Sequence, residues 1–167
     1  MKEKHANVNW QAHWIWQPSA EISGGYQRWT ESQRPDSPNT YVYFRREFEQ
    51  STVPDHCPLR VSADTSYRLF INGSLVGWGP VMTEPRWQTY DTYEAAPFLK
   101  PGVNVIGAIV YHFGNGPDNP IRNTFHPSRG GFLCQLDFPT ASPPLLTDAS
   151  WQCLQSKAWK KEVPKMD

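Results

Sequence analysis

The sequence lacks the features that mark several classes of protein. Its 16 Lys and Arg balance its 16 Asp and Glu, so it has no net charge to attract nucleic acid or an anionic membrane. The longest apolar run near the middle, residues 105–110, is far too short to span a bilayer. No segment carries a helical apolar stripe of useful length. These absences predict little helix and neither a nucleic-acid nor a membrane partner.

The sequence is also poor in cysteine and has no apparent leader. Residues 1–14, MKEKHANVNWQAHW, contain no apolar segment of the kind that a signal peptide needs. The three cysteines cannot all pair with one another, and free thiols fit a reducing compartment. We therefore expect a cytoplasmic protein, or a secreted or periplasmic one whose leader has been removed.

Patterns for metal, cofactor and catalysis are missing as well. Cys57 and Cys153 have no metal-ligand spacing to each other or to histidine, and the five histidines never pair at ligand spacing. There is no glycine-rich phosphate loop before a helix and no nucleophile elbow. We expect no metal and no cofactor, and no pair of acids stands out as catalytic.

Aromatic residues and turn formers, by contrast, are plentiful. The chain has 8 Trp, 7 Tyr and 8 Phe, which make up 14% of its residues, and it has 16 Pro and 11 Gly. Apolar residues recur with period two in short segments, and this predicts strands separated by turns. The expected strands lie at residues 40–49, 59–64, 67–71, 74–78, 102–113, 131–138 and 151–156. The pattern predicts an all-β, jelly-roll-like antiparallel β-sandwich.

Residues 62–80, SADTSYRLFINGSLVGWGP, form the most regular stretch of the chain. Asn72-Gly73 is a strong hairpin signal, because both residues tolerate the positive φ of a type I′ turn. Alternation predicts that one face of the first strand, with Leu69 at its centre, packs into the core. We interpret the stretch as a scaffold hairpin, with any binding role at residues 78–80 and in the loops nearby.

Two further strands indicate where the core lies. Residues 102–113 are apolar on both faces, so we expect a central strand covered on both sides. Cys134 alternates with large apolar residues and is predicted to be a core thiol.

We expect a single β-sandwich domain over residues 1–160, followed at 161–167 by a tail or the start of a linker to an absent catalytic domain.

Several polar residues within these strands have structural explanations. His112 is predicted to be a hydrogen-bonded histidine in the interior or at a sheet edge, not a metal ligand. Asp64 is predicted to cap a turn instead of contacting a ligand. Arg45 and Arg46 point to opposite faces of a strand, so one lies beside apolar residues and needs an acid. We expect a structural ion pair with Asp64 or Asp91, and an anion site is the alternative.

Six segments of the chain occur in a familiar order. They are WIW at 14–16, YVYFRREFE at 41–49, LRVSADTSYRLFINGSLVGWGP at 59–80, YDTYEAAPFLKPGVNVIGAIVYHFGNG at 90–116, GFLCQLDF at 131–138 and LLTDASWQCLQSKAW at 145–159. Together they closely resemble the N-terminal β-sandwich module of bacterial α-L-rhamnosidases, which form glycoside hydrolase family 78. The resemblance covers about residues 10–159 and implies a galactose-binding-domain-like fold.

The resemblance also implies a function. In such enzymes the catalytic acids lie on a separate (α/α)6 barrel that follows the module, and hydrolysis proceeds with inversion. No catalytic residue is therefore transferred to this chain. We expect a non-catalytic accessory domain that docks on the barrel or shapes the entrance to its active site. The alternatives are an independent carbohydrate-binding module for glycans that contain L-rhamnose and, least favoured, a complete small enzyme.

Candidate sugar contacts come from segments with aromatic, cationic and amide groups. Residues 17–39 and 114–130 lack any periodicity, and loops of this length in a compact domain are usually functional or disordered. Sugar sites use aromatic rings for apolar C–H patches and planar polar groups for hydroxyls. The candidate sugar-binding residues are Trp29, Trp78, Arg86, Trp87, Asp118, Asn119 and Arg122. Some of them have a structural alternative: the Trp residues as core or interdomain contacts, and Asp118-Asn119 before Pro120 as a turn.

Overall fold

The computed structural model describes residues 9–17, 39–81, 88–113, 130–139 and 142–159. Apart from one short 3-10 helix, η1 (Ala96–Phe98), every regular element in these ranges is a β-strand. The strands are β1 (Thr40–Gln50), β2 (Pro58–Ala63), β3 (Ser66–Ile71), β4 (Ser74–Gly79), β5 (Asp91–Glu94), β6 (Gly102–His112), β7 (Phe132–Leu136), β8 (Leu145–Leu146) and β9 (Gln152–Gln155). No helix in the described ranges is long and apolar enough to cross a membrane.

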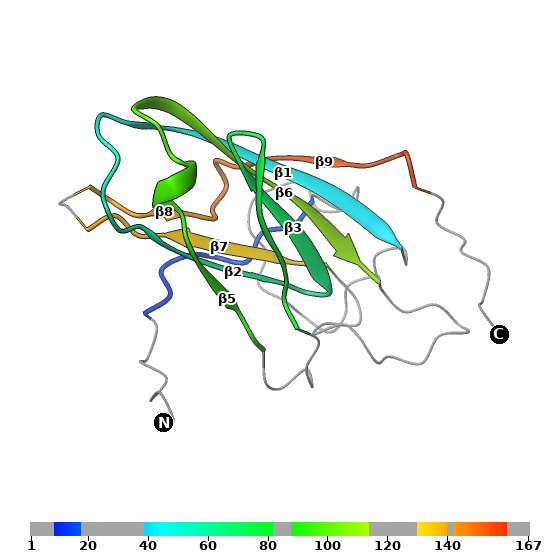
Figure 1. The fold of residues 1–167 in the computed structure, drawn as a ribbon. Helices are drawn as coiled ribbons and strands as arrows, with labels where there is room; N and C mark the ends of the chain where they lie inside the picture. Colours follow the sequence, from blue (N-terminus) through cyan, green and yellow to red (C-terminus); the bar gives the residue numbers. More distant parts are fainter. Residues whose placement is uncertain (1–8, 18–38, 82–87, 114–129, 140–141, 160–167) are drawn as a thin grey trace.

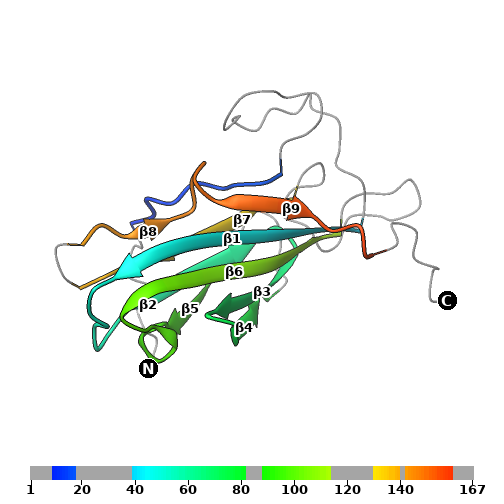
Figure 2. The same ribbon diagram turned by 90° about the horizontal axis from the view of Figure 1, so that it is seen from above.

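The strands form two antiparallel sheets that pack face to face (Figure 1). One sheet has the order β4-β3-β6-β1-β9 and the other has the order β5-β2-β7-β8. Figure 2, seen from above, shows β9, β1, β6 and β3 side by side across the larger sheet. The predicted all-β, jelly-roll-like antiparallel sandwich is confirmed. Burial of the two inner faces provides the stabilising free energy, as in other sandwiches.

The core lies between the inner faces of these sheets. Period-two alternation places every second residue of each strand there. Phe44 of β1 stacks on Phe132 of β7 with ring centroids 5.2 Å apart, and Trp151 packs edge-on against the same ring at 5.7 Å. The fully buried inner residues include Val42, Leu59, Val61, Leu69, Ile71, Ile106, Val110, Cys134 and Leu136. The predictions for Leu69 and for a core thiol at Cys134 are confirmed.

The hairpin between β3 and β4 turns at the predicted position. Asn72 has φ 50° and Gly73 has φ 84°, as a type I′ turn requires. Ile71 pairs with Ser74 on either side of the turn. Further along, the register shifts between Leu69 and Phe70, which marks a β-bulge.

Strand β6 differs from the prediction for residues 102–113. It is central, because β1 and β3 pair with it on either side. However, only its inner face is buried; Ile109 on the outer face is half-buried and Val103 is 56% exposed. The expectation of a strand covered on both sides is therefore wrong. Antiparallel sheets commonly leave one face open to water, and the apolar outer face of β6 belongs to such a surface.

Strand β7, by contrast, is buried on both sides. Gln135 points away from the core, yet it is almost fully buried. Its side-chain carbonyl accepts hydrogen bonds from the backbone amides of Gln11 (2.9 Å) and Ala12 (3.3 Å). Ile15 forms a β-bridge with Phe132. The segment that contains residues 9–17 thus covers part of the smaller sheet.

Candidate functional site

The ends of three undescribed segments meet at one end of the sandwich. The amide of Asn39 donates to the carbonyl of Phe113 (3.1 Å), and that of Asp64 donates to the carbonyl of Gly131 (3.0 Å). Segments 18–38 and 114–129 therefore begin or end beside the connection between β2 and β3. We call this the loop end of the sandwich.

Val81 and Thr89, which flank the third segment, 82–87, are tied to the same end. The hydroxyl of Thr89 donates to the carbonyl of Val81 (3.0 Å), and the hydroxyl of Ser62 donates to the carbonyl of Thr89 (2.7 Å). Ser62 lies next to the end of β2 at the loop end. Of the sequence-predicted sugar contacts, these lie outside the described residues: Trp29, Arg86, Trp87, Asp118, Asn119 and Arg122. Their roles stay predictions.

Trp78 is the predicted contact that the structure does describe. It lies on β4, and the residue is 74% exposed. It pairs across the hairpin with Arg68 of β3, which is also exposed. The guanidinium of Arg68 has no hydrogen bond or ion pair among the described residues. An exposed indole therefore lies beside a cation whose five N–H donors face no protein acceptor in the described ranges.

The backbone beneath Trp78 is held by a polar network between the sheets. The hydroxyl of Tyr67 donates to Asp91 Oδ2 (2.6 Å) and lies 3.0 Å from the hydroxyl of Tyr93. The Tyr93 hydroxyl also donates to the carbonyl oxygen of Trp78 (3.3 Å). Burial, followed by the hydrogen bond to Asp91, raises the pKa of Tyr67 far above its ordinary value. Tyr67 therefore remains a neutral donor at physiological pH.

Two glycines beside Trp78 allow this network to form. A Cβ at Gly77 would overlap the ring of Tyr93, and a Cβ at Gly79 would overlap the carboxylate of Asp91. The sequence Gly-Trp-Gly thus lets side chains of β5 approach the backbone of β4 closely on the inner side, while the indole points outward.

Trp78 and Arg68 begin a row of side chains that crosses the whole outer face of the larger sheet. Arg68 pairs with Ile109 of β6, Ile109 with Tyr43 of β1, and Tyr43 with Leu154 of β9. Directly paired residues project to the same side of a sheet, so all five lie on the outer face. We call these five residues the outer row. The sequence alone did not predict Arg68, Tyr43 and Leu154 as surface partners of Trp78, because partners across strands are set by register.

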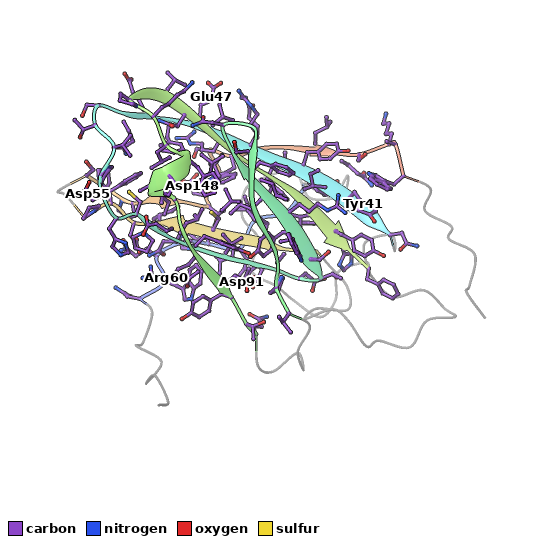
Figure 3. All side chains as sticks on the ribbon, viewed as in Figure 1. Tyr41, Glu47, Asp55, Arg60, Asp91 and Asp148 are labelled. Carbon is purple, nitrogen blue, oxygen red and sulfur yellow. The ribbon has the colours of Figure 1, made fainter. Side chains whose placement is uncertain are left out.

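A second aromatic group lies on the same face, nearer the loop end. Tyr41 stacks on Tyr111 at 4.6 Å and on Trp159 at 4.5 Å between ring centroids. Burial, and then the neighbouring Tyr41 phenol, raise the pKa of Tyr111 to about 12. Figure 3 labels Tyr41 and Glu47 toward opposite ends of β1, and Asp91 on the other sheet. The outer face is thus aromatic near the loop end and charged farther away.

The polar residues discussed from the sequence have defined partners. His112 is fully buried and its Nδ1 lies 2.7 Å from Asp64 Oδ2, so the prediction of a hydrogen-bonded interior histidine is confirmed. Asp64 does accept from the neighbouring hydroxyl of Thr65 (3.1 Å), but it is more than a turn cap, because it bridges to β6. A buried pair of this kind holds the loop end together.

The prediction that Arg45 or Arg46 forms an ion pair with Asp64 or Asp91 is wrong. Arg45 pairs with Glu47 on the exposed face of β1, and Arg46 donates to the backbone carbonyl of Ser150 (3.1 Å). Asp64 and Asp91 are engaged by His112 and Tyr67. Alternation along β1 places Arg45 and Glu47, two residues apart, on the same face. Glu47 is therefore closer to the guanidinium of Arg45 than an acid in the core would be.

No group of three or more His, Cys, Asp or Glu side chains within the described ranges is arranged to hold a metal ion. The buried thiol of Cys134 has a raised pKa because of its burial, which disfavours the thiolate. The described surface carries aromatic and cationic side chains in the outer row of the larger sheet. Such a surface suits binding by stacking and hydrogen bonding.

The fold and the exposed face define a β-sandwich module with a potential binding surface. Among solved structures, the chain is similar to part of a glycoside hydrolase family 78 rhamnosidase from Bacillus sp. GL1. The match has 31% identity and a TM-score of 0.66, and it covers 89% of this chain and 14% of that chain. The resemblance to a module of these α-L-rhamnosidases, predicted from the sequence, is thus confirmed. Neither a scan of protein-family models nor a search of the curated proteins gives a match.

Two other structures share the fold. An α-L-rhamnosidase from Aspergillus terreus matches with 24% identity and a TM-score of 0.59, over 74% of this chain and 16% of that one. A lectin from Pleurotus ostreatus matches with 23% identity and a TM-score of 0.54, over 93% of this chain and 38% of the lectin. The chain therefore spans only a small part of the length of these proteins.

Proposed function

We propose that this chain is a non-catalytic accessory domain of an α-L-rhamnosidase-like glycoside hydrolase. It docks on a catalytic (α/α)6 barrel or shapes the entrance to its active site, and the parent enzyme inverts the anomeric centre. One observation carries the proposal: 89% of the chain matches 14% of the Bacillus rhamnosidase chain at 31% identity. A match of that proportion is what a single domain of a multidomain enzyme gives.

The proposed compartment is the cytoplasm, supported by three free cysteines.

The exposed apolar side chains away from the loop end support an interdomain contact. Leu75 on β4 and Val103 on β6 are both largely exposed on the outer side of the larger sheet. Apolar residues exposed on one open sheet face give a neighbouring domain apolar surface to bury.

Two experiments test the accessory-domain proposal. The gene is sequenced beyond codon 167, and we expect the reading frame to continue into a helical barrel; a stop codon there with no adjacent barrel gene would contradict docking in cis. The purified chain is also assayed with a chromogenic α-L-rhamnoside, and we expect no hydrolysis. Turnover that disappears when one acidic residue of this chain is changed would overturn the proposal.

A second candidate function is binding of glycans that contain L-rhamnose. The exposed indole of Trp78 beside Arg68 favours it. The same fold occurs in a Pleurotus ostreatus lectin that was solved in complex with GalNAc. A monosaccharide has few atoms with which to gain contact energy, so we expect a dissociation constant for L-rhamnose on the order of 0.1–10 mM. Titration with L-rhamnose followed by NMR tests this, and shifts confined to the end opposite the loop end would show that the site is misplaced.

A further inference from the structure

We propose that the outer row is a glycan platform, on which a hexopyranoside ring stacks on Trp78 and is held through its oxygens by Arg68. The inference rests on the second function proposed above, sugar binding. It deepens that function by placing the sugar along the open face of the larger sheet and by requiring a glycan longer than one ring. The row consists of Trp78, Arg68, Ile109, Tyr43 and Leu154.

Trp78 presents its indole to solvent on a strand whose backbone is held in place. The residue is 74% exposed, although burying an indole is among the most favourable contributions that a side chain makes to folding. Its backbone is held by Tyr93 from the inner side. An exposed aromatic plane on a fixed strand is pre-organised, so little conformational entropy is lost when an apolar sugar face covers it.

Arg68 provides an unpaired cation next to Trp78 among the described residues. Arg68 pairs directly with Trp78 across the hairpin, and none of the described residues supplies its guanidinium with an acid. Arg45 and Glu47 are charged residues on the same face, and they pair with each other. A planar guanidinium beside an aromatic plane therefore retains its donors for sugar hydroxyl or carboxylate oxygens.

The outer row is longer than a single sugar ring. Neighbouring strands lie about 4.8 Å apart, so the three strand steps from Trp78 to Tyr43 extend roughly 14 Å. That length exceeds one pyranose ring. Ile109 in the middle offers an apolar contact, which suits a C–H face or the methyl group of a 6-deoxy sugar. The geometry therefore points to a glycan of two or more units, bound more tightly than a monosaccharide.

The lack of net charge favours a sugar over a nucleic acid, which also stacks on aromatic residues. Nucleic-acid binding depends on several cations that neutralise phosphates, and the chain has 16 basic residues against 16 acidic ones. Along the outer row, Arg68 is the single charged residue.

The test uses the full chain and two probes, L-rhamnose and an α-linked rhamnose disaccharide, followed by amide and indole NMR shifts. We expect shifts at Trp78, Arg68 and Ile109, with the disaccharide binding more tightly. Trp78→Ala and Arg68→Gln should each weaken binding about tenfold or more. Leu75→Ala is the matched control, because Leu75 is exposed on the same strand but outside the row, and it should leave binding unchanged.

The outcomes separate this inference from the functions on which it depends. Binding that survives both Trp78→Ala and Arg68→Gln, with shifts only at residues of the loop end, would preserve sugar binding and overturn the platform. The absence of any shift with either probe at high millimolar concentration would overturn the platform and the sugar-binding function together. The accessory-domain proposal is judged separately by its gene-sequence and hydrolysis tests. Unchanged amide spectra of the variants show that they have folded.

Discussion

Asp64 and His112 are joined in the interior of the sandwich, with 2.7 Å between Asp64 Oδ2 and His112 Nδ1. Both side chains are almost completely buried. Asp64 lies in the connection between β2 and β3, and His112 is the last residue of β6. The hydroxyl of Thr65, which itself donates to Asp64, accepts the amide of Phe113 (3.1 Å). The contact thus links the two sheets where three candidate loop segments begin or end.

Removing the histidine should be strongly destabilising. In His112→Leu the carboxylate of Asp64 keeps the hydroxyl of Thr65 but loses the buried imidazole, and breaking a buried pair costs up to about 3–5 kcal/mol. Denaturant unfolding measures the free energy of unfolding. The control is Glu47→Gln, which breaks the exposed pair with Arg45 and should change stability by about 0.5 kcal/mol or less. Equal losses in both variants would show that the interior pair has no special role.

The two isoleucines of β6 should differ in their contribution to stability. Ile106 is fully buried on the inner face, whereas Ile109 is half-buried on the outer face. We expect Ile106→Ala to cost about 2–5 kcal/mol, like Leu69→Ala, and Ile109→Ala to cost about 1 kcal/mol. From the sequence alone, by contrast, the predicted loss for Ile109→Ala is also about 2–5 kcal/mol. Thermal or denaturant unfolding distinguishes the two, and a loss at Ile109 as large as that at Ile106 would mean that the outer face is covered.

Either glycine beside Trp78 should resist substitution. Gly77→Ala forces a methyl group against the ring of Tyr93, and Gly79→Ala forces one against Asp91. Overpacking of this kind typically costs about 1–3 kcal/mol. Ser74→Ala, at an exposed position of the same strand, is the control and should be nearly neutral. If both glycine variants unfold at the same denaturant concentration as the parent, the close approach of β5 to β4 is incorrect.

Tyr111 should ionise later than an ordinary tyrosine. Its pKa is raised to about 12 by burial and by Tyr41, compared with about 10 in an unfolded chain. Because the folded-state pKa is the higher one, the stability from this group is fully present below pH of about 10 and is lost as the pH rises through about 12. The pKa of Tyr111 is measured by ultraviolet titration of phenolate, as the difference between the parent and Tyr111→Phe. A difference signal that titrates near 10 would contradict the stacked, half-buried environment.

The sequence was sufficient to predict the features that depend on local patterns. Period-two alternation identified β1, β3 and β7, because neighbouring side chains on a strand point to opposite faces whatever the fold. Asn72-Gly73 identified the hairpin, because positive φ at two successive residues is a local requirement. The burial of Cys134 followed from the same alternation. The six ordered segments supplied the family resemblance, which the Bacillus rhamnosidase structure supports.

The tertiary structure decided what depends on contacts distant in the sequence. A regular two-residue hairpin at Asn72-Gly73 would pair Trp78 with Tyr67 and point the indole into the core; the bulge near Leu69 shifts the register by one residue. Trp78 therefore pairs with Arg68 and faces outward, because a shift of one residue moves a side chain to the opposite face of a sheet. The pair between Asp64 and His112 spans 48 residues of sequence. Such contacts are chosen by sheet order and register, which are properties of the assembled sandwich and not of any single segment.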